Sequence, residues 1–142
     1  MIRRFSLSDL KRVVEIDEKS FKVPHDEWVF RYYYYLNPKN FFVYEADQQV
    51  VGFVLFEREG HLLYLAVDPL YRRRGIGRIL VAEAKKHLKK GAHPWAEVRR
   101  SNLAAQRFYQ SLGFVRERVI LNYYGNEDAY IMVTSQKVRS SG

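Results

Sequence analysis

The sequence predicts a single α/β (α+β) domain, with about four helices flanking a central, mixed and mostly antiparallel sheet of about seven strands. The chain has 142 residues, and its hydrophobic (47%) and charged (28%) fractions are those of one folded domain. The spacing of apolar residues alternates between helical and extended periods. Three extended segments in the middle follow one another with only short turns between them, which is typical of an antiparallel meander. We expect the domain to span 1–138 and to be followed by a polar tail, 139–142.

The first third of the chain predicts one strand and two helices. Residues 2–5 can form a strand, and apolar side chains at helical spacing then predict a helix capped by Ser6 or Ser8 and ended by Pro24. A second short helix is expected over 26–36, because the Asn-Pro pair after it stops a helix. Its four tyrosines are expected to serve mostly in packing.

From residue 41 the apolar spacing becomes extended. The segments 41–46, 50–59 and 61–68 are expected to form the meander. The remaining elements are expected to be a helix over 75–90, a strand over 95–99, a helix over 102–112 and strands over 114–123 and 129–137.

Composition and charge limit the classes of function that the chain can have. The net charge of +8 favours an anionic partner, although a solvated basic face is an alternative reading. The longest apolar stretches, such as Leu62–Val67, are far shorter than the roughly 18 residues of a membrane span. The N-terminus lacks the apolar core of a secretory signal, and the chain has no cysteine, which excludes disulfides and thiolate chemistry. A cytoplasmic location is expected.

The four histidines show no metal-ligand spacing, so we expect them to be surface or capping residues and expect no metal. They are His25, His61, His87 and His93.

A glycine-containing turn between a strand and a helix carries the first chemical signal. In LAVDPLYRRRGIGR, residues 65–78, Gly75 and Gly77 remove side chains where backbone N–H groups open a helix. Arg72, Arg73, Arg74 and Arg78 flank these glycines. This arrangement predicts a phosphate or pyrophosphate ligand in preference to a simple tight turn. No Walker lysine follows, which disfavours a nucleoside triphosphatase.

A dinucleotide-binding site is an alternative reading of the same turn. Glu97 lies 20 residues after Gly77, as the acidic residue of such sites does. However, the third glycine position is Leu80, and a meander precedes the turn instead of a strand-helix-strand unit. The dinucleotide reading is therefore disfavoured.

Three blocks of sequence resemble one known family. Arg72-x-x-Gly75-x-Gly77 resembles the pyrophosphate loop of the GCN5-related N-acetyltransferase (GNAT) family. The block EVRRSNLAAQRFYQSLGF at 97–114 and the block LNYYGNEDAYIM at 121–132 resemble the RimI/ARD1-like branch, whose members acetylate the N-termini of ribosomal and other proteins. The resemblance covers nearly the whole chain and implies a GNAT-like fold.

The resemblance implies acetyl-CoA as donor and CoA as product. The backbone of Leu65, Ala66 and Val67 would pair with the pantetheine arm, and one N–H group there would polarise the thioester carbonyl. The loop would bind the pyrophosphate through Arg72, Arg73, Arg74, Gly75, Ile76, Gly77 and Arg78. The resemblance also places Asn102 on pantetheine and Tyr109 near the sulfur, while an ordinary helix cap and a core aromatic are the alternatives.

Glu97 is the best candidate for the general base, acting directly or through a water molecule. It alternates with Trp95 and Arg99 on one face of its strand, beside the cofactor motif, and its rival role is an ion pair with a neighbouring arginine. Tyr109 is the candidate acid. Full proton transfer from a tyrosine to a thiolate is uphill by about 2 kcal/mol, so a hydrogen bond to sulfur or a lowered tyrosine pKa would be needed.

The expected acceptor is the N-terminal α-amine of a protein, possibly a ribosomal protein. At pH 7 roughly a tenth of such amines is neutral, against less than about a thousandth of lysine side chains, so one carboxylate base serves the first more easily. The resemblance implies that Phe21, Val23, Pro24, Tyr123 and Tyr124 enclose the peptide, with simple packing as the alternative.

Two departures from the family pattern affect the acceptor side. Asn126 stands where relatives tend to have glycine, and Val23-Pro24-His25 replaces an early Pro-Trp pair. Acetylation of lysine or of a small-molecule amine therefore remains an alternative, as does a basic module that binds RNA or ribosomes. No membrane partner and no direct nucleic-acid binding are expected, because no nucleic-acid signature is present.

Overall fold

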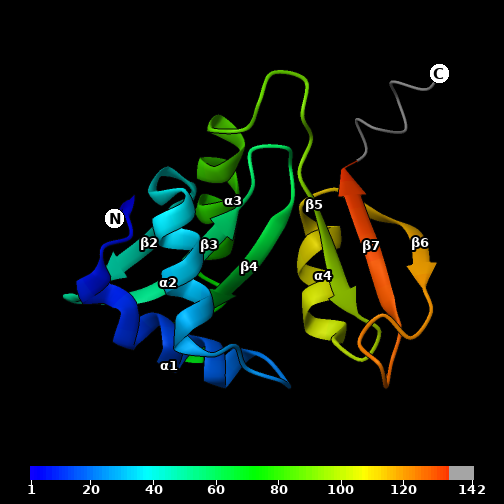
Figure 1. Ribbon diagram of the computed structural model, residues 1–142, viewed down its shortest axis with the longest axis horizontal. Coiled ribbons are helices and arrows are strands. Elements are labelled where there is room, and N and C mark those ends of the chain that lie inside the picture. Colours follow the sequence, from blue (N-terminus) through cyan, green and yellow to red (C-terminus); the bar gives the residue numbers. More distant parts are fainter. Residues whose placement is uncertain (135–142) are drawn as a thin grey trace. The chain divides into compact units, whose positions relative to one another are not determined.

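Residues 1–134 are described by the computed structural model shown in Figure 1. Their contacts divide the chain into two units. Unit 1 comprises Met1–Arg58 and Leu62–His87, and unit 2 comprises Glu59–His61 and the described residues from Leu88 onwards. The expected end of the last strand at Lys137 and the polar tail 139–142 lie outside the described residues.

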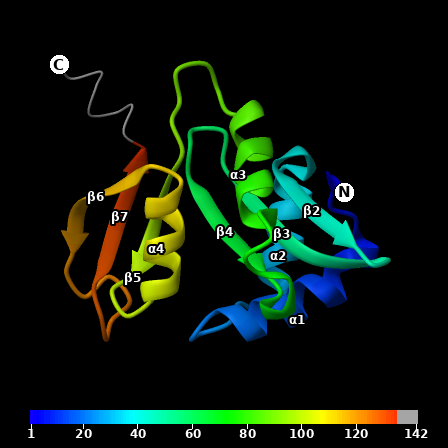
Figure 2. The same ribbon diagram turned by 180° about the vertical axis from the view of Figure 1, so that it is seen from behind.

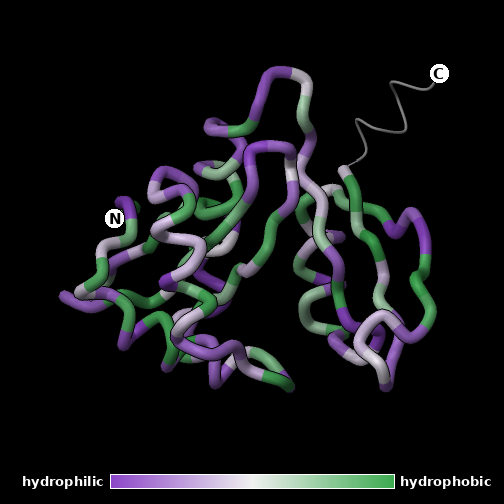
Figure 3. Tube along the Cα trace, viewed as in Figure 1, coloured by the Kyte–Doolittle hydropathy of each residue, from purple (hydrophilic) through white to green (hydrophobic). Residues whose placement is uncertain are grey.

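The sheet of unit 1 contains four antiparallel strands. They are β1 (Ile2–Arg4), β2 (Phe41–Ala46), β3 (Gln49–Phe56) and β4 (Leu62–Val67), in the order β1-β2-β3-β4. This confirms the predicted meander. The turn between β2 and β3 consists of Asp47 and Gln48, both with positive φ, as the tightest hairpin turns require. Figure 3 shows the turn after β3 as hydrophilic. β3 ends at Phe56, directly before the charged residues Glu57, Arg58 and Glu59.

Helices cover both faces of this sheet. Figures 1 and 2 show α1 (Leu10–Ser20) and α2 (Glu27–Leu36) on one face and α3 (Ile76–Lys86) on the other. All residues of β3 after Gln49 are buried, because a strand covered on both faces has no solvent side. At Gly52 an added Cβ would lie 3.1 Å from Leu80 and 3.3 Å from Ile76, so the glycine lets α3 approach the sheet closely.

Several predictions about the helices differ from the structure. Ser6 forms a capping box with Asp9 on the 3-10 turn Leu7–Asp9 that precedes α1, whereas the N-cap residue of α1 itself is Asp9 and not a serine. The expectation that the tyrosines of α2 mostly pack is wrong for Tyr32 and Tyr35, which are 54% and 66% exposed. The expected extension of α3 to Lys90 is also wrong: α3 ends at Lys86, because the backbone of His87 leaves the helical conformation, with φ of −107° and ψ of 2°.

Unit 2 contains a second antiparallel sheet. Its strands are β5 (Trp95–Arg99), β6 (Phe114–Ile120) and β7 (Ala129–Thr134), in the order β5-β7-β6, and α4 (Leu103–Ser111) packs against it (Figure 1). The four α-helices and seven strands of the described residues confirm the fold class, but the strands form two sheets instead of one. β6 ends at Ile120 and not at Tyr123, because Asn122 turns the chain with a φ of 53° and its N–H group donates to Asp128. No helix within residues 1–134 has the length and apolar character of a membrane span.

Candidate active site

The loop between β4 and α3 has the geometry of an anion site. Arg73 and Gly75 both adopt left-handed backbone conformations, with φ of 63° and 80°. Turns with such residues direct successive N–H groups towards one point, and the first N–H groups of a helix have no acceptor within that helix. Apart from Gly75 and its chain neighbours, no atom of residues 1–134 lies within 4 Å of the position that a Cβ of Gly75 would occupy, which leaves room for a ligand. The loop therefore fits a pyrophosphate at the N-terminus of α3.

A buried carboxylate holds the start of this loop. Asp68 is 3% exposed, accepts a hydrogen bond from the backbone N–H of Leu70 at 3.0 Å, and pairs with Arg12 of α1 at 3.0 Å. Burial would raise the pKa of Asp68, but the Leu70 and Arg12 hydrogen bonds outweigh it and lower that pKa. Asp68 therefore stays ionised and keeps the loop attached to α1.

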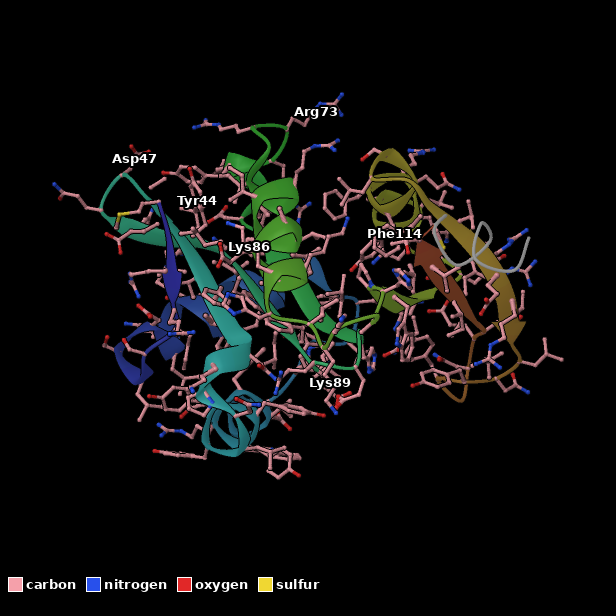
Figure 4. All side chains as sticks on the ribbon, turned by 90° about the horizontal axis from the view of Figure 1, so that it is seen from above. Tyr44, Asp47, Arg73, Lys86, Lys89 and Phe114 are labelled. Atoms are coloured by element: carbon pink, nitrogen blue, oxygen red, sulfur yellow. The ribbon has the colours of Figure 1, made fainter. Side chains whose placement is uncertain are left out.

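The arginines of the loop differ in their surroundings. The guanidinium of Arg72 donates to the carbonyl of Val67 at 2.9 Å and to Ser20 Oγ at 3.3 Å. That of Arg74 lies 4.9 Å from the ring centre of Tyr71. Arg73 and Arg78 are exposed, and Figure 4 shows Arg73 at the tip of the loop with its side chain directed away from the ribbon. Arg72 thus anchors the loop, and direct contacts of the four arginines with a cofactor remain predictions.

The strand predicted to bind pantetheine lies at an edge. β4 is the last strand of the four-stranded sheet and pairs with β3 along one side. An edge strand presents backbone N–H and C=O groups that an extended amide-bearing ligand can pair with. The backbone of Leu65 and Ala66 fits the predicted role, whereas the carbonyl of Val67 is already taken by Arg72.

In unit 2 the candidate base is held by a histidine. Glu97 alternates with Trp95 and Arg99 on β5, as predicted, and His61 Nε2 lies 3.0 Å from its Oε1 and 2.9 Å from its Oε2. The His61 ring stacks on Trp95 with 4.1 Å between ring centres. Only glycine fits at position 60, since an added Cβ would lie 2.2 Å from the carbonyl oxygen of His93. This close approach places His61 beside Glu97.

These contacts correct two expectations. The partner of Glu97 is a histidine and not an arginine, because Arg99 pairs with Glu127 at 2.9 Å. His61 is also no surface residue, since its side chain is 16% exposed. The pairing could not be predicted from the sequence, because His61 is marked there only as a histidine that follows a glycine at the start of a strand, and it forms no recognisable motif with Glu97.

Among the other histidines, His93 and His87 match the expectation of surface or capping residues, whereas His25 does not. His25 and His87 are half-buried and pair with Asp17 and Glu83, both at 2.9 Å, while His93 is exposed. His87 lies at the C-terminal cap of α3. Within residues 1–134 no three histidine or acidic side chains gather as a metal site would require.

Tyr109 is buried in the last turn of α4. It is 7% exposed and lies 5.1 Å from Phe114 between ring centres. Burial, and secondly the negative charge of Glu97, raise the pKa of its hydroxyl well above the ordinary value. The alternative of a lowered pKa is therefore wrong. Tyr109 stays protonated and can act as a hydrogen-bond donor.

Tyr109→Phe is expected to lower kcat about 10²-fold while acetyl-CoA affinity stays nearly unchanged. The phenyl ring keeps the packing against Phe114 and loses only the donor that would stabilise the departing sulfur. Single-turnover kinetics and calorimetry measure the two quantities separately, with Tyr130→Phe on β7 as a matched control. A kcat within about twofold of the wild type would exclude Tyr109 from the chemistry.

Asn102 is the N-cap of α4. Its Oδ1 accepts a hydrogen bond from the backbone N–H of Ala105 at 3.0 Å, which confirms the reading as a helix cap. The cap leaves the Asn102 side-chain amide NH2 group for another acceptor. The predicted contact with pantetheine therefore remains compatible with the cap and stays a prediction.

The turn before β7 brings two tyrosines into the electrostatic field of Glu97. Tyr123 and Tyr124 pack edge to face at 4.9 Å, and the guanidinium of Arg99 lies 3.9 Å from the ring centre of Tyr124. Burial first, and then Glu97, raise the pKa of Tyr124 to about 12, and the same two causes raise that of Tyr123. Both hydroxyls stay neutral and can donate hydrogen bonds. Their predicted contact with an acceptor peptide is not tested by this geometry.

The other predicted acceptor residues lie in unit 1, between α1 and α2. Phe21 packs against the core, whereas Val23 is 55% exposed and Pro24 is also exposed. The alternative role of simple packing therefore fits Phe21, but it does not fit the exposed Val23 and Pro24. Their role towards a peptide stays a prediction.

Comparison with known proteins decides the family. Residues 10–114 match the model of the acetyltransferase (GNAT) family. The chain belongs to the GNAT family. This GNAT enzyme is therefore an N-acetyltransferase that uses acetyl-CoA. Pyrophosphate binding by the loop before α3 stays a prediction.

Three relatives show how far the similarity extends. The GNAT chain is 32% identical to an uncharacterized N-acetyltransferase of Methanocaldococcus jannaschii, covering 100% of this chain and 95% of that protein. It is 36% identical to the ribosomal protein bS18-alanine N-acetyltransferase of Salmonella typhimurium, covering 89% and 91%. The crystal structure of Ard1 from Thermoplasma volcanium superposes with a TM-score of 0.81 at 29% identity, covering 94% and 97%. These proteins confirm the RimI/ARD1-like resemblance.

Proposed function

We propose that this GNAT enzyme acetylates the N-terminal α-amine of proteins. The observation that carries the proposal is the pairing of Glu97 with His61, which provides one fixed carboxylate base with three tyrosines in its field. One carboxylate suffices for an α-amine, whose pKa of about 8 lies close to neutral, whereas lysine near 10.4 holds its proton much more firmly. The names of the Salmonella and Thermoplasma relatives agree with such an acceptor.

Each candidate residue of the chain would have a separate role in the reaction. Acetyl-CoA supplies an acyl group activated as a thioester. The Glu97 carboxylate takes the proton of the acceptor nitrogen, directly or through water, while that nitrogen forms a bond to the acyl carbon and the carbon–sulfur bond breaks. The Tyr109 hydroxyl donates a hydrogen bond to the departing sulfur. His61 keeps the Glu97 carboxylate oriented, and the loop of Gly75 and Gly77 binds the pyrophosphate.

The enclosing role of the acceptor residues is part of the same proposal. Phe21, Val23 and Pro24 would line the peptide's first residues on one side, and Tyr123 and Tyr124 would donate hydrogen bonds to its backbone. We also propose that residues 1–138 act as one acetyltransferase domain, since the family match crosses from unit 1 into unit 2. A ribosomal protein as substrate and a cytoplasmic location belong to the proposal as well, supported by the bS18 relative.

A competition experiment tests the acceptor. A peptide with a free N-terminus and the same peptide with a blocked N-terminus and one internal lysine are mixed with the enzyme and acetyl-CoA. We expect acetylation of the free N-terminus at least about tenfold faster, because far more of that amine is neutral. Mass spectrometry reads both products. Equal or faster lysine acetylation would overturn the proposal in favour of a lysine acetyltransferase.

A further inference from the structure

A buried carboxylate near the acceptor residues has both oxygens directed at one histidine. Asp17 lies in the last turn of α1 and is 0% exposed. The backbone N–H of His25 donates to its Oδ2 at 2.6 Å, and the ring Nδ1 of His25 lies 2.9 Å from its Oδ1. A carboxylate removed from water is stable only where donors replace the lost water. Asp17 and His25 therefore form one structural pair.

The ring of His25 is held by aromatic side chains as well. It lies 4.0 Å from the ring of Tyr64 on β4 and meets Phe21 edge to face at 5.3 Å, measured between ring centres. The pair thus fixes the end of the segment 21–25, while Phe21 fixes its beginning. Between these two points the segment carries exposed Val23 and Pro24. A non-helical segment of this kind keeps one conformation only where its ends are fixed.

The same turn of α1 also contacts the cofactor loop. Ser20 Oγ accepts a hydrogen bond from Arg72 at 3.3 Å and donates to the carbonyl of Ile16 at 2.6 Å. Arg72 reaches from there to the carbonyl of Val67 at the end of β4. The end of α1 is therefore tied to the cofactor loop on one side and, through Asp17, to the segment 21–25 on the other.

We propose that Asp17 and His25 are positioning residues that hold the segment 21–25 in the conformation that receives the acceptor peptide. The inference rests on the acceptor site of the proposed function and deepens it. Loss of the pair frees the segment, so a peptide must order it on binding and binds more weakly. The chemical step and the cofactor loop keep their own contacts. Acceptor KM should therefore change while kcat and acetyl-CoA affinity do not.

The variant His25→Phe tests the proposal, because it keeps an aromatic ring and the backbone donor to Asp17 but removes the ring nitrogen that contacts Asp17 Oδ1. We expect acceptor KM to rise about tenfold, the usual effect of losing a hydrogen bond to a charged group, with kcat within about threefold of the wild type. His25→Asn should restore KM, since its amide nitrogen stands where Nδ1 stood. Asp17→Asn should resemble His25→Phe. Calorimetry should show unchanged acetyl-CoA affinity in all three.

His87→Phe is the matched control. His87 forms an equivalent pair with Glu83 at 2.9 Å and stacks on Phe42 at 4.9 Å, away from the segment 21–25. Its loss should leave acceptor KM unchanged. Thermal unfolding verifies that each variant is folded.

The outcomes separate this inference from the proposed function. A wild-type enzyme that transfers no acetyl group to peptide N-termini would overturn both. An active wild type with acceptor KM within about twofold in His25→Phe would overturn the positioning role alone. A fall of kcat and of acetyl-CoA affinity together with the rise in KM would also overturn the positioning role, because a general loss of structure would change all three quantities.

Discussion

Glu97→Gln is expected to lower kcat by about 10²- to 10³-fold, with acetyl-CoA affinity unchanged within about twofold. Glutamine keeps the shape of the side chain and one oxygen for His61, but it cannot take a proton. The loss should therefore appear in the chemical step and spare cofactor binding. Single-turnover rates with saturating acetyl-CoA and peptide measure the first quantity, and calorimetry measures the second.

The pH dependence of the same variant is informative. Without a base the rate should follow the neutral fraction of the acceptor amine, rising until the pH passes the amine pKa of about 8, so the deficit shrinks at high pH. Glu83→Gln is the matched control, since it also alters a carboxylate that pairs with a histidine, His87, at 2.9 Å. A Glu97→Gln enzyme with kcat within about threefold of the wild type would assign the base to another group.

Gly77→Glu is expected to abolish measurable acetyl-CoA binding. Gly77 is buried in the first turn of α3, where backbone N–H groups and the positive end of the helix dipole favour an anion. A glutamate side chain there occupies the space of the pyrophosphate and adds a like charge. Calorimetry with acetyl-CoA on the folded variant measures the effect.

Ala82→Glu controls for the added charge. Ala82 is exposed on the same helix, so the substitution changes the net charge equally without entering the loop. It should bind acetyl-CoA about as tightly as the wild type. Unchanged affinity of a folded Gly77→Glu variant would contradict the assignment of the loop.

The helices and strands of this chain could be predicted from local sequence patterns. Helices and strands differ in the period at which apolar residues recur, and this local signal located all four α-helices and all seven strands of the described residues. The loop before α3 is also a local feature, because Gly75 and Gly77 would act through their own backbone at the junction of two adjacent elements, and its role in cofactor binding stays a prediction. Glu97 and Tyr109 followed from a resemblance of contiguous blocks.

The partners of the candidate site residues could not be predicted from such patterns. His61 and Glu97 are 36 residues apart in the chain, and Asp17 and His25 meet only because the chain reverses after α1. His87, at the C-cap of α3, likewise stacks on Phe42, a residue of β2. Such contacts join side chains from different elements, and their energy depends on distances that no local spacing encodes. For this reason the sequence could name Glu97 as the candidate base, and the fold identified the histidine that pairs with it.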